Sequence, residues 1–318
     1  MFIQIVLIIV GLALLVKGAD WLVTGASSLA KKYKISDLAI GLTIVAFGTS
    51  APELVVNSFA SFQGYQDLVF GNVIGSNNFN LFMILGITGL IAPLVVRSST
   101  VSREIPISFL AIIILFFFAN SFFYALTPIV TRLEGLVLLI LFVLFLFYVF
   151  KQLKADPTEL DIEQKTSSIP KISGLIALGL AGLVFGGRLV VINAVDLATT
   201  LGMSEKIIGL TIVAAGTSLP ELATSVVAIL KKNNDIAVGN IIGSNIFNIF
   251  LILGVSSIIN PIQYSVAFNT ELYLLACGTI FLYLAMFTGQ KKILDRWEAA
   301  LLLITYLAYM IYLISKEM

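Results

Sequence analysis

Two blocks of the sequence occur twice, and both pairs are separated by the same number of residues. Residues 40–53 (IGLTIVAFGTSAPE) align without gaps on residues 208–221 (IGLTIVAAGTSLPE), with 12 of 14 positions identical. Residues 71–80 align on residues 239–248 with 8 of 10 identical, and the offset is 168 in each case. The chain is therefore a tandem duplication, and it must fold as two copies of one structural unit.

Most of each copy consists of apolar runs that are long enough to cross a membrane. Hydrophobic residues make up 59% of the 318 residues and charged residues 12%, with a mean hydropathy of +1.04. A water-soluble domain could not bury so much apolar surface. A helix needs ~20 apolar residues to cross the hydrocarbon core. Ten spans satisfy this criterion: 2–30, 38–62, 68–92, 105–122, 130–150, 172–200, 206–230, 236–259, 268–288 and 297–315.

Each copy contains an odd number of these spans. The first unit covers residues 1–150 and the second covers residues 172–318, with a polar linker at 151–171. Because the first copy has an odd number of spans, the second copy enters the membrane from the opposite side. The two copies are therefore related by a pseudo-two-fold axis in the membrane plane. We therefore expect an all-α integral membrane protein of two inverted five-helix repeats, with discontinuous helices at its centre.

The basic residues predict which side of the membrane each loop occupies. If the loops alternate, 14 Lys and Arg residues lie on one side and 3 on the other. Cytoplasmic loops carry the excess of Lys and Arg. This places both termini outside the cell, the linker in the cytoplasm and the chain in the plasma membrane. The net charge of +1 and the short basic clusters exclude a nucleic-acid partner, and we expect no obligatory protein partner.

The chain has no histidine and a single cysteine, Cys277. This excludes an imidazole or thiolate site for zinc or copper, and it excludes a Ser-His-Asp mechanism. A hydrolase that used Ser50 or Ser218 would need a Lys or His base beside the serine, and neither stands there. The sequence favours a transporter over an enzyme, with no cofactor.

A single carboxylate occupies the middle of the second span and of the seventh. Glu53 is the only charged residue in the 25 residues from Leu38 to Phe62, and Glu221 is isolated in the same way. Placing a carboxylate at the bilayer centre costs ~2.5–3.5 kcal/mol of insertion free energy. A glutamine could make the same structural hydrogen bonds without this cost. Charged residues in spans therefore indicate an ion pathway here.

The residues beside each glutamate supply further oxygen atoms. Pro52 and Pro220 have no amide hydrogen, so the carbonyls of Gly48 and Gly216 lose their helical partners. Hydroxyl groups within one turn come from Thr49, Ser50, Thr217 and Ser218. Alone, such hydroxyls would be expected to bond to their own helix. The neighbouring proline, glycine and glutamate favour a cation site instead.

The third span of each copy adds amides and hydroxyls at helical spacing. One face carries Asn72, Ser76 and Asn80 in the first copy, and Asn240, Ser244 and Asn248 in the second. Asn77 and Asn245 lie off this face, and we interpret them as interhelical contacts. The whole set suits a hard cation such as Ca²⁺, which accepts 6–8 oxygen ligands in flexible geometry. Two carboxylates balance one Ca²⁺ or two monovalent ions, and competition for one such site produces antiport.

At these residues the sequence resembles the calcium/cation antiporter superfamily, in its prokaryotic sodium/calcium exchanger branch. The motifs are Gly-Thr-Ser-x-Pro-Glu and Gly-Asn-x-x-Gly-Ser-Asn-x-x-Asn, and the resemblance covers essentially the whole chain. It implies alternating access, in which the long first and sixth helices slide over a fixed core. Its implied ligands are Glu53 and Glu221 for both Ca²⁺ and Na⁺, Thr49 and Thr217 beside them, and backbone oxygens near Ala46 and Ala214 with Ser76 and Ser244 for flanking Na⁺.

One departure leaves the counter-ion open. Many relatives have an aspartate in one of the third-span blocks, where this chain has Asn80 and Asn248. The alternatives to Ca²⁺/Na⁺ exchange are Ca²⁺/H⁺ antiport and K⁺-dependent antiport. A passive cation channel is a further alternative, because polar half-helices can also line a pore.

Three charged residues in the first and sixth spans allow two interpretations. Lys17 and Asp20 are three residues apart, and Arg188 occupies the position equivalent to Asp20. Their side chains either extend to the membrane surface or form an ion pair or gate near the ends of the mobile helices.

Overall fold

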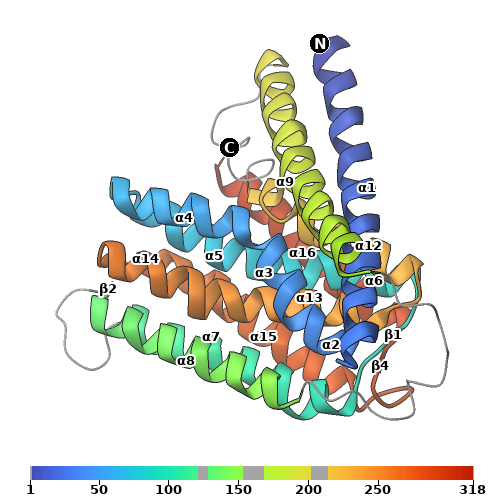
Figure 1. Cartoon of the computed structure of the whole chain (residues 1–318). Helices are drawn as coiled ribbons and strands as arrows, with labels where there is room; N and C mark the ends of the chain where they lie inside the picture. The colour runs from blue at the N-terminus through green and yellow to red at the C-terminus, as the bar shows by residue number, and fades with distance from the viewer. Residues whose placement is uncertain (1, 121–127, 153–167, 202–213, 318) are drawn as a thin grey trace.

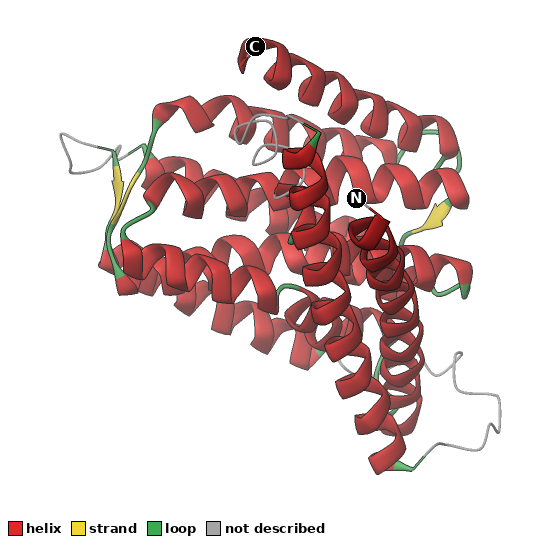
Figure 2. Ribbon diagram, turned by 90° about the horizontal axis from the view of Figure 1, so that it is seen from above, coloured by secondary structure: helices red, strands yellow, loops and turns green. Residues whose placement is uncertain are grey.

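The computed structural model describes residues 2–120, 128–152, 168–201 and 214–317. These residues are almost entirely helical, apart from four two-residue strands (Figure 2). The first part of the predicted span 206–230 and most of the predicted linker 151–171 lie outside the described residues.

The helices of the first copy follow the predicted spans. They are α1 (Phe2–Tyr33); α2 (Asp37–Ile40), η1 (Gly41–Val45), α3 (Ala46–Thr49) and α4 (Ala51–Gln63); α5 (Gln66–Asn78), η2 (Phe79–Ile84) and α6 (Leu85–Ile91); η3 (Thr100–Glu104) and α7 (Ile105–Ala119); and α8 (Arg132–Lys151). The segments η1, η2 and η3 are π-helical turns within longer helices. Such turns occur often at functional sites.

The helices of the second copy repeat this order. They are α9 (Ile169–Thr200); α11 (Ala214–Gly216) and α12 (Leu219–Leu230); α13 (Asn234–Phe247), η6 (Asn248–Leu253) and α14 (Gly254–Ile259); η7 (Val266–Phe268) and α15 (Asn269–Ala285); and α16 (Arg296–Glu317). The π-helical η6 stands at the position equivalent to η2.

Among the described residues, eight helical segments are long and apolar enough to cross a membrane. A ninth is counted when the bent pair Asp37–Thr49 and Ala51–Gln63 is taken as one span, and Leu219–Leu230 is a shorter apolar helix. The protein is therefore an all-helical, multi-pass membrane protein.

The two 32-residue helices, α1 and α9, pack against each other as an antiparallel pair (Figure 1). Glycines form the contact: a Cβ atom on Gly18 would lie 2.8 Å from the Gly179 carbonyl oxygen, and one on Gly186 would lie 2.8 Å from the Gly11 carbonyl oxygen. Small residues allow helix backbones to approach closely. In Figure 1 one end of this pair stands clear of the other helices.

Two short ribbons join the copies. β1 (Leu94–Val95) pairs with β4 (Ile293–Leu294), and β2 (Ile129–Val130) pairs with β3 (Ile262–Gln263). β1 follows the third span of the first copy, and β3 follows the equivalent span of the second copy. The two ribbons nevertheless lie at opposite ends of the bundle (Figures 1 and 2).

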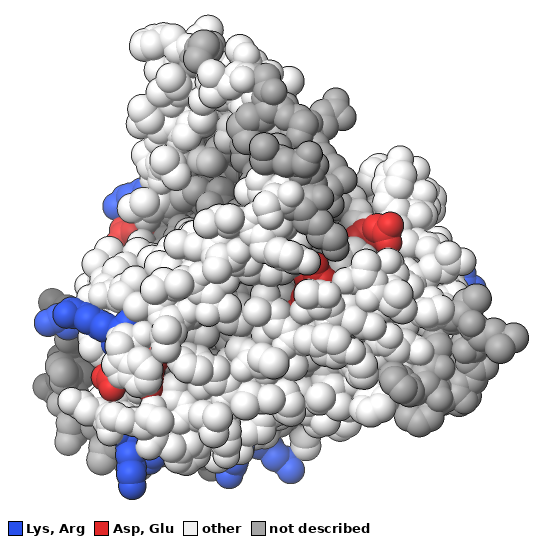
Figure 3. All heavy atoms as spheres, turned by 180° about the vertical axis from the view of Figure 1, so that it is seen from behind, with Lys and Arg blue, Asp and Glu red and all other residues white. Residues whose placement is uncertain are grey.

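The end of the bundle with the β1–β4 ribbon also gathers basic residues. Arg97 Nε lies 2.6 Å from Asp235 Oδ2, and Lys292 Nζ donates to Ser98 Oγ at 2.7 Å. In Figure 3 the Lys and Arg side chains of the visible face lie mainly toward the left edge, which is this end of the molecule. The basic residues visible in Figure 3 thus gather mainly at one end of the protein.

Candidate cation site

The second span breaks in its middle, at Ser50. This residue has φ −85° and ψ 4°, and the helical parts on either side are bent by 47°. Ser218 has nearly the same conformation before α12, with φ −93° and ψ 7°. Pro52 and Pro220 lie in the first turn of the helix that follows, a position that favours proline. The Gly-Thr-Ser-x-Pro-Glu block thus interrupts the helix, as predicted.

Gly48 and Gly216, the glycines of the two Gly-Thr-Ser-x-Pro-Glu blocks, pack against α9. A Cβ atom on Gly48 would lie 2.3 Å from Leu180 Cδ2, and one on Gly216 would lie 2.3 Å from Val191 Cγ2. Both helix breaks therefore touch the long helix of the second copy directly.

Both glutamates are buried in the first turn of their helices. The exposed fraction is 2% for Glu53 and 1% for Glu221. A helix N-terminus favours a negative charge, so α4 and α12 each stabilise their carboxylate. Ser50 Oγ donates to Glu221 Oε1 at 2.9 Å, which links the first motif to the acid of the second.

The threonines of the two motifs bind across the repeats in the same way. Thr49 Oγ1 donates to Asn240 Oδ1 at 3.0 Å, and Thr217 Oγ1 donates to Asn72 Oδ1 at 3.2 Å. Asn240 also donates to the Glu221 carbonyl at 3.3 Å. Each motif therefore contacts the third span of the opposite copy, and the two motifs meet at one place.

Several buried oxygen atoms of the predicted ligands have no hydrogen-bond partner among the described residues. They are Glu53 Oε2, Glu221 Oε2, Ser218 Oγ, Ser244 Oγ, Asn80 Oδ1 and Asn248 Oδ1. An unsatisfied buried polar group costs about 1–3 kcal/mol, and more when it is charged. Such oxygens are the ligands that Ca²⁺ and Na⁺ require, so this set fits a hard cation.

Two of the remaining predicted ligands, Ser76 and the Ala46 carbonyl, already have hydrogen-bond partners within the protein. Ser76 Oγ donates to Asn72 Oδ1 at 3.2 Å. The Ala46 carbonyl accepts hydrogen bonds from Ser50 N at 2.9 Å and from Thr49 Oγ1 at 3.3 Å, so a cation would compete for this oxygen. Ala214 opens α11, and the surroundings of its side chain are not described.

Two polar residues that were not predicted as ligands also lie beside the candidate site, one helical turn after each glutamate. Asn57 Nδ2 donates to the Glu53 carbonyl at 2.8 Å, and Ser225 Oγ accepts from Asn240 Nδ2 at 3.0 Å. Asn57 and Ser225 are equivalent in the two copies, each four residues after a glutamate. A polar residue repeated at this spacing is the signal that could have found them.

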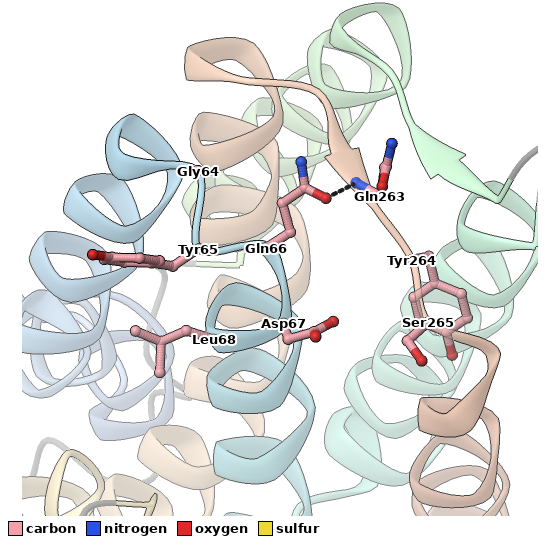
Figure 4. A pocket seen from close by; sticks show the side chains of 8 residues that line it. All are labelled: Gly64, Tyr65, Gln66, Asp67, Leu68, Gln263, Tyr264 and Ser265. Atoms are coloured by element: carbon pink, nitrogen blue, oxygen red, sulfur yellow. Dashed lines mark hydrogen bonds between the residues drawn. The ribbon is translucent and has the colours of Figure 1, made fainter.

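An open cavity of about 630 Å³ lies apart from these ligands. It is lined by residues 64–68 and 263–265, next to the β2–β3 ribbon. In Figure 4 the side chain of Asp67 points across it toward Ser265, and Gln66 Oε1 accepts from Gln263 N at 3.2 Å. Its lining includes none of the predicted ligands, so the cavity is separate from the candidate site.

The described residues form a helical membrane protein, and buried oxygens from both of its copies fit a hard cation. Residues 3–151 and 171–315 match the family model described as sodium/calcium exchanger protein. The chain belongs to this family of cation exchangers, and it is a transporter rather than an enzyme.

Relatives and a solved structure agree with this membership. The chain is 39% identical to CaxA of Alkalimonas amylolytica, over 99% of this chain and 100% of that protein. It is 31% identical to the sodium/calcium exchanger MaX1 of Methanosarcina acetivorans, over 98% of each chain. A structure of the sodium-calcium exchanger NCX_Mj superposes with a TM-score of 0.83 at 30% identity, covering 98% of this chain and 99% of that one.

Proposed function

We propose that the chain exchanges Ca²⁺ for Na⁺ across the plasma membrane by alternating access. The observation that carries this proposal is the set of unpartnered buried oxygens, which includes a carboxylate oxygen from each copy. The names of MaX1 and NCX_Mj as sodium/calcium exchangers support sodium as the counter-ion.

The charge of the site sets how many ions it can hold. Glu53 and Glu221 provide two negative charges, and no group of three His, Cys, Asp or Glu residues that could hold a metal occurs in the described part of the chain. One Ca²⁺ neutralises the two carboxylates, and so do two Na⁺ ions. In this proposal Thr49, Thr217, Ser50, Ser218, Asn80 and Asn248 complete the site, and Ser76, Ser244, Ala46 and Ala214 add flanking Na⁺ ligands.

The proposed topology has ten spans in two inverted repeats, with units at 1–150 and 172–318 and a cytoplasmic linker at 151–171. The placement of the equivalent strands β1 and β3 at opposite ends of the bundle supports the inversion. The basic residues around the β1–β4 ribbon support a cytoplasmic location for that end, with both termini outside.

The pair α1 and α9 is the element that would move. At the end of the bundle with the β1–β4 ribbon, α1 packs against α12. The equivalent helices of the other copy are α9 and α4, and these two make little contact with each other. Lys231 Nζ lies 2.6 Å from Asp20 Oδ1 and donates to the Asp20 carbonyl at 2.9 Å. Asp20 therefore forms ion pairs with both Lys17 and Lys231. In this proposal the contact between Asp20 and Lys231 closes the end with the β1–β4 ribbon in an outward-facing conformation.

Replacing Lys231 by Ala is expected to release this closed end. A partly exposed ion pair contributes about 0–1 kcal/mol, so the equilibrium between the two states should shift up to about fivefold. In oriented vesicles the apparent KM for Ca²⁺ should fall on the cytoplasmic side and rise on the other. Lys17→Ala is the matched control, because Lys17 pairs with Asp20 at 3.1 Å within α1 alone. Equal effects in the two variants would argue against a gate.

Proteoliposomes test the proposed exchange itself. Vesicles loaded with Na⁺ should accumulate Ca²⁺ against its gradient, and vesicles loaded with choline should not. Potassium and pH gradients are applied separately without sodium, to measure K⁺ dependence and Ca²⁺/H⁺ exchange. Uptake driven by the pH gradient alone would overturn sodium coupling, and equilibration without accumulation would indicate a channel.

A further inference from the structure

Asn77 and Asn245 bind each other across the two copies. Asn77 Nδ2 donates to the Asn245 carbonyl at 3.2 Å, and Asn245 Nδ2 donates to the Asn77 carbonyl at 3.5 Å. Both residues are at most 4% exposed. A backbone carbonyl can only accept, so the nitrogen of each side-chain amide must face it. This contact therefore fixes the orientation of both amides.

The fixed amides in turn orient two further asparagines. Asn77 Oδ1 accepts from Asn248 Nδ2 at 2.9 Å, and Asn245 Oδ1 accepts from Asn80 Nδ2 at 3.1 Å. The amide nitrogens of Asn80 and Asn248 are thus committed to these bonds. Their oxygens point the other way, buried and without a partner among the described residues. An amide that turned over would present its NH₂ group, which repels a cation.

We propose that Asn77 and Asn245 are positioning residues that hold the amide oxygens of Asn80 and Asn248 toward the transported cation. The inference rests on the proposed function, in which Asn80 and Asn248 are ligands. It also explains why asparagine fits at both positions: an ionised aspartate would place an oxygen against Asn245 Oδ1 or Asn77 Oδ1. Two acceptors without a proton between them repel each other.

The test is a calorimetric Ca²⁺ titration of the purified full-length protein. Asn77→Ala should lower Ca²⁺ affinity about tenfold, the effect of losing roughly one good hydrogen bond to the ligand. Asn78→Ala is the matched control, because Asn78 is 2% exposed and donates to the Glu271 carbonyl at 3.1 Å. The Asn78→Ala variant removes a buried amide from the same helix, but it leaves the bond between Asn77 and Asn248 in place. Its affinity should stay within about twofold of the unmodified protein.

A double-variant cycle separates positioning from packing. In an Asn248→Ser background the ligand is a hydroxyl, which has no amide to orient, so Asn77→Ala should then change the affinity less than about twofold. An equal loss in both backgrounds would overturn the positioning role. The variants Asn245→Ala and Asn80→Ser give the equivalent cycle for the other pair of asparagines. This second cycle tests the positioning role if Asn77→Ala does not fold.

The outcomes distinguish this inference from the proposed function. If Asn80→Ala and Asn248→Ala both bind Ca²⁺ like the unmodified protein, the ligand role of these amides fails, and the positioning role fails with it. If they weaken binding while Asn77→Ala behaves like Asn78→Ala, the positioning role alone is wrong.

Discussion

Replacing Glu53 or Glu221 by Gln is expected to abolish Ca²⁺ uptake. Each change removes one of the two charges that balance Ca²⁺ while keeping the size of the side chain. At an effective dielectric constant of about 20, unit charges 4 Å apart interact by ~4 kcal/mol. The loss of one carboxylate should therefore weaken Ca²⁺ binding about 100-fold or more, as measured by calorimetry and by uptake into Na⁺-loaded proteoliposomes.

Glu104→Gln is the matched control for these two variants. Glu104 is also fully buried in a span, and it accepts a hydrogen bond from Tyr148, which is not a predicted ligand. The substitution makes the same change from acid to amide outside the candidate ligand set, so Ca²⁺ uptake should persist. Uptake that survives in both Glu53→Gln and Glu221→Gln would show that the site has been assigned to the wrong residues.

Replacing Gly18 by Leu is expected to stop transport and to destabilise the protein. A Cβ atom at this position would lie 2.8 Å from both the Gly179 carbonyl oxygen and the Leu183 amide nitrogen. These are backbone atoms, so α1 and α9 would have to separate. Overpacking costs about 1–3 kcal/mol, and a leucine adds far more than a Cβ atom. Thermal unfolding and Ca²⁺ uptake should both report the loss.

Gly174→Leu provides the comparison on the same pair of helices. A Cβ atom on Gly174 in α9 would have no heavy atom within 4 Å. Substitutions at such open positions usually change stability by less than ~0.5 kcal/mol, so this variant should unfold and transport like the unmodified protein. Normal transport by Gly18→Leu would contradict the proposal that α1 and α9 work as one closely packed unit.

The sequence predicts much of this architecture because hydropathy and the internal repeat are strong signals. The predicted spans 130–150, 172–200 and 236–259 agree within three residues with Arg132–Lys151, Ile169–Thr200 and Asn234–Ile259. The fourth span is different: its helix begins at Thr100 rather than at 105. The polar segment TVSRE forms a π-helical turn there, and hydropathy does not reveal a helix that starts in polar residues.

The contacts between the copies could be predicted only in part. The inverted repeat indicates that the two motifs face each other, and Ser50 does reach Glu221. It does not say which residues pair, because that depends on how the helices of the two copies pack. The bonds from Thr49 to Asn240 and from Asn77 to Asn245 join residues 191 and 168 positions apart. The strand pairs are equally hidden, since a two-residue strand has no pattern of its own.

The central claim is that one cation site is completed by a carboxylate from each copy. A structure determined with Ca²⁺ or Sr²⁺ bound tests this directly. We expect one divalent ion that contacts oxygens of both Glu53 and Glu221, at the distances of ~2.3–2.6 Å that Ca²⁺ adopts. An ion held by the carboxylate of one copy alone, or bound away from both glutamates, would contradict the account.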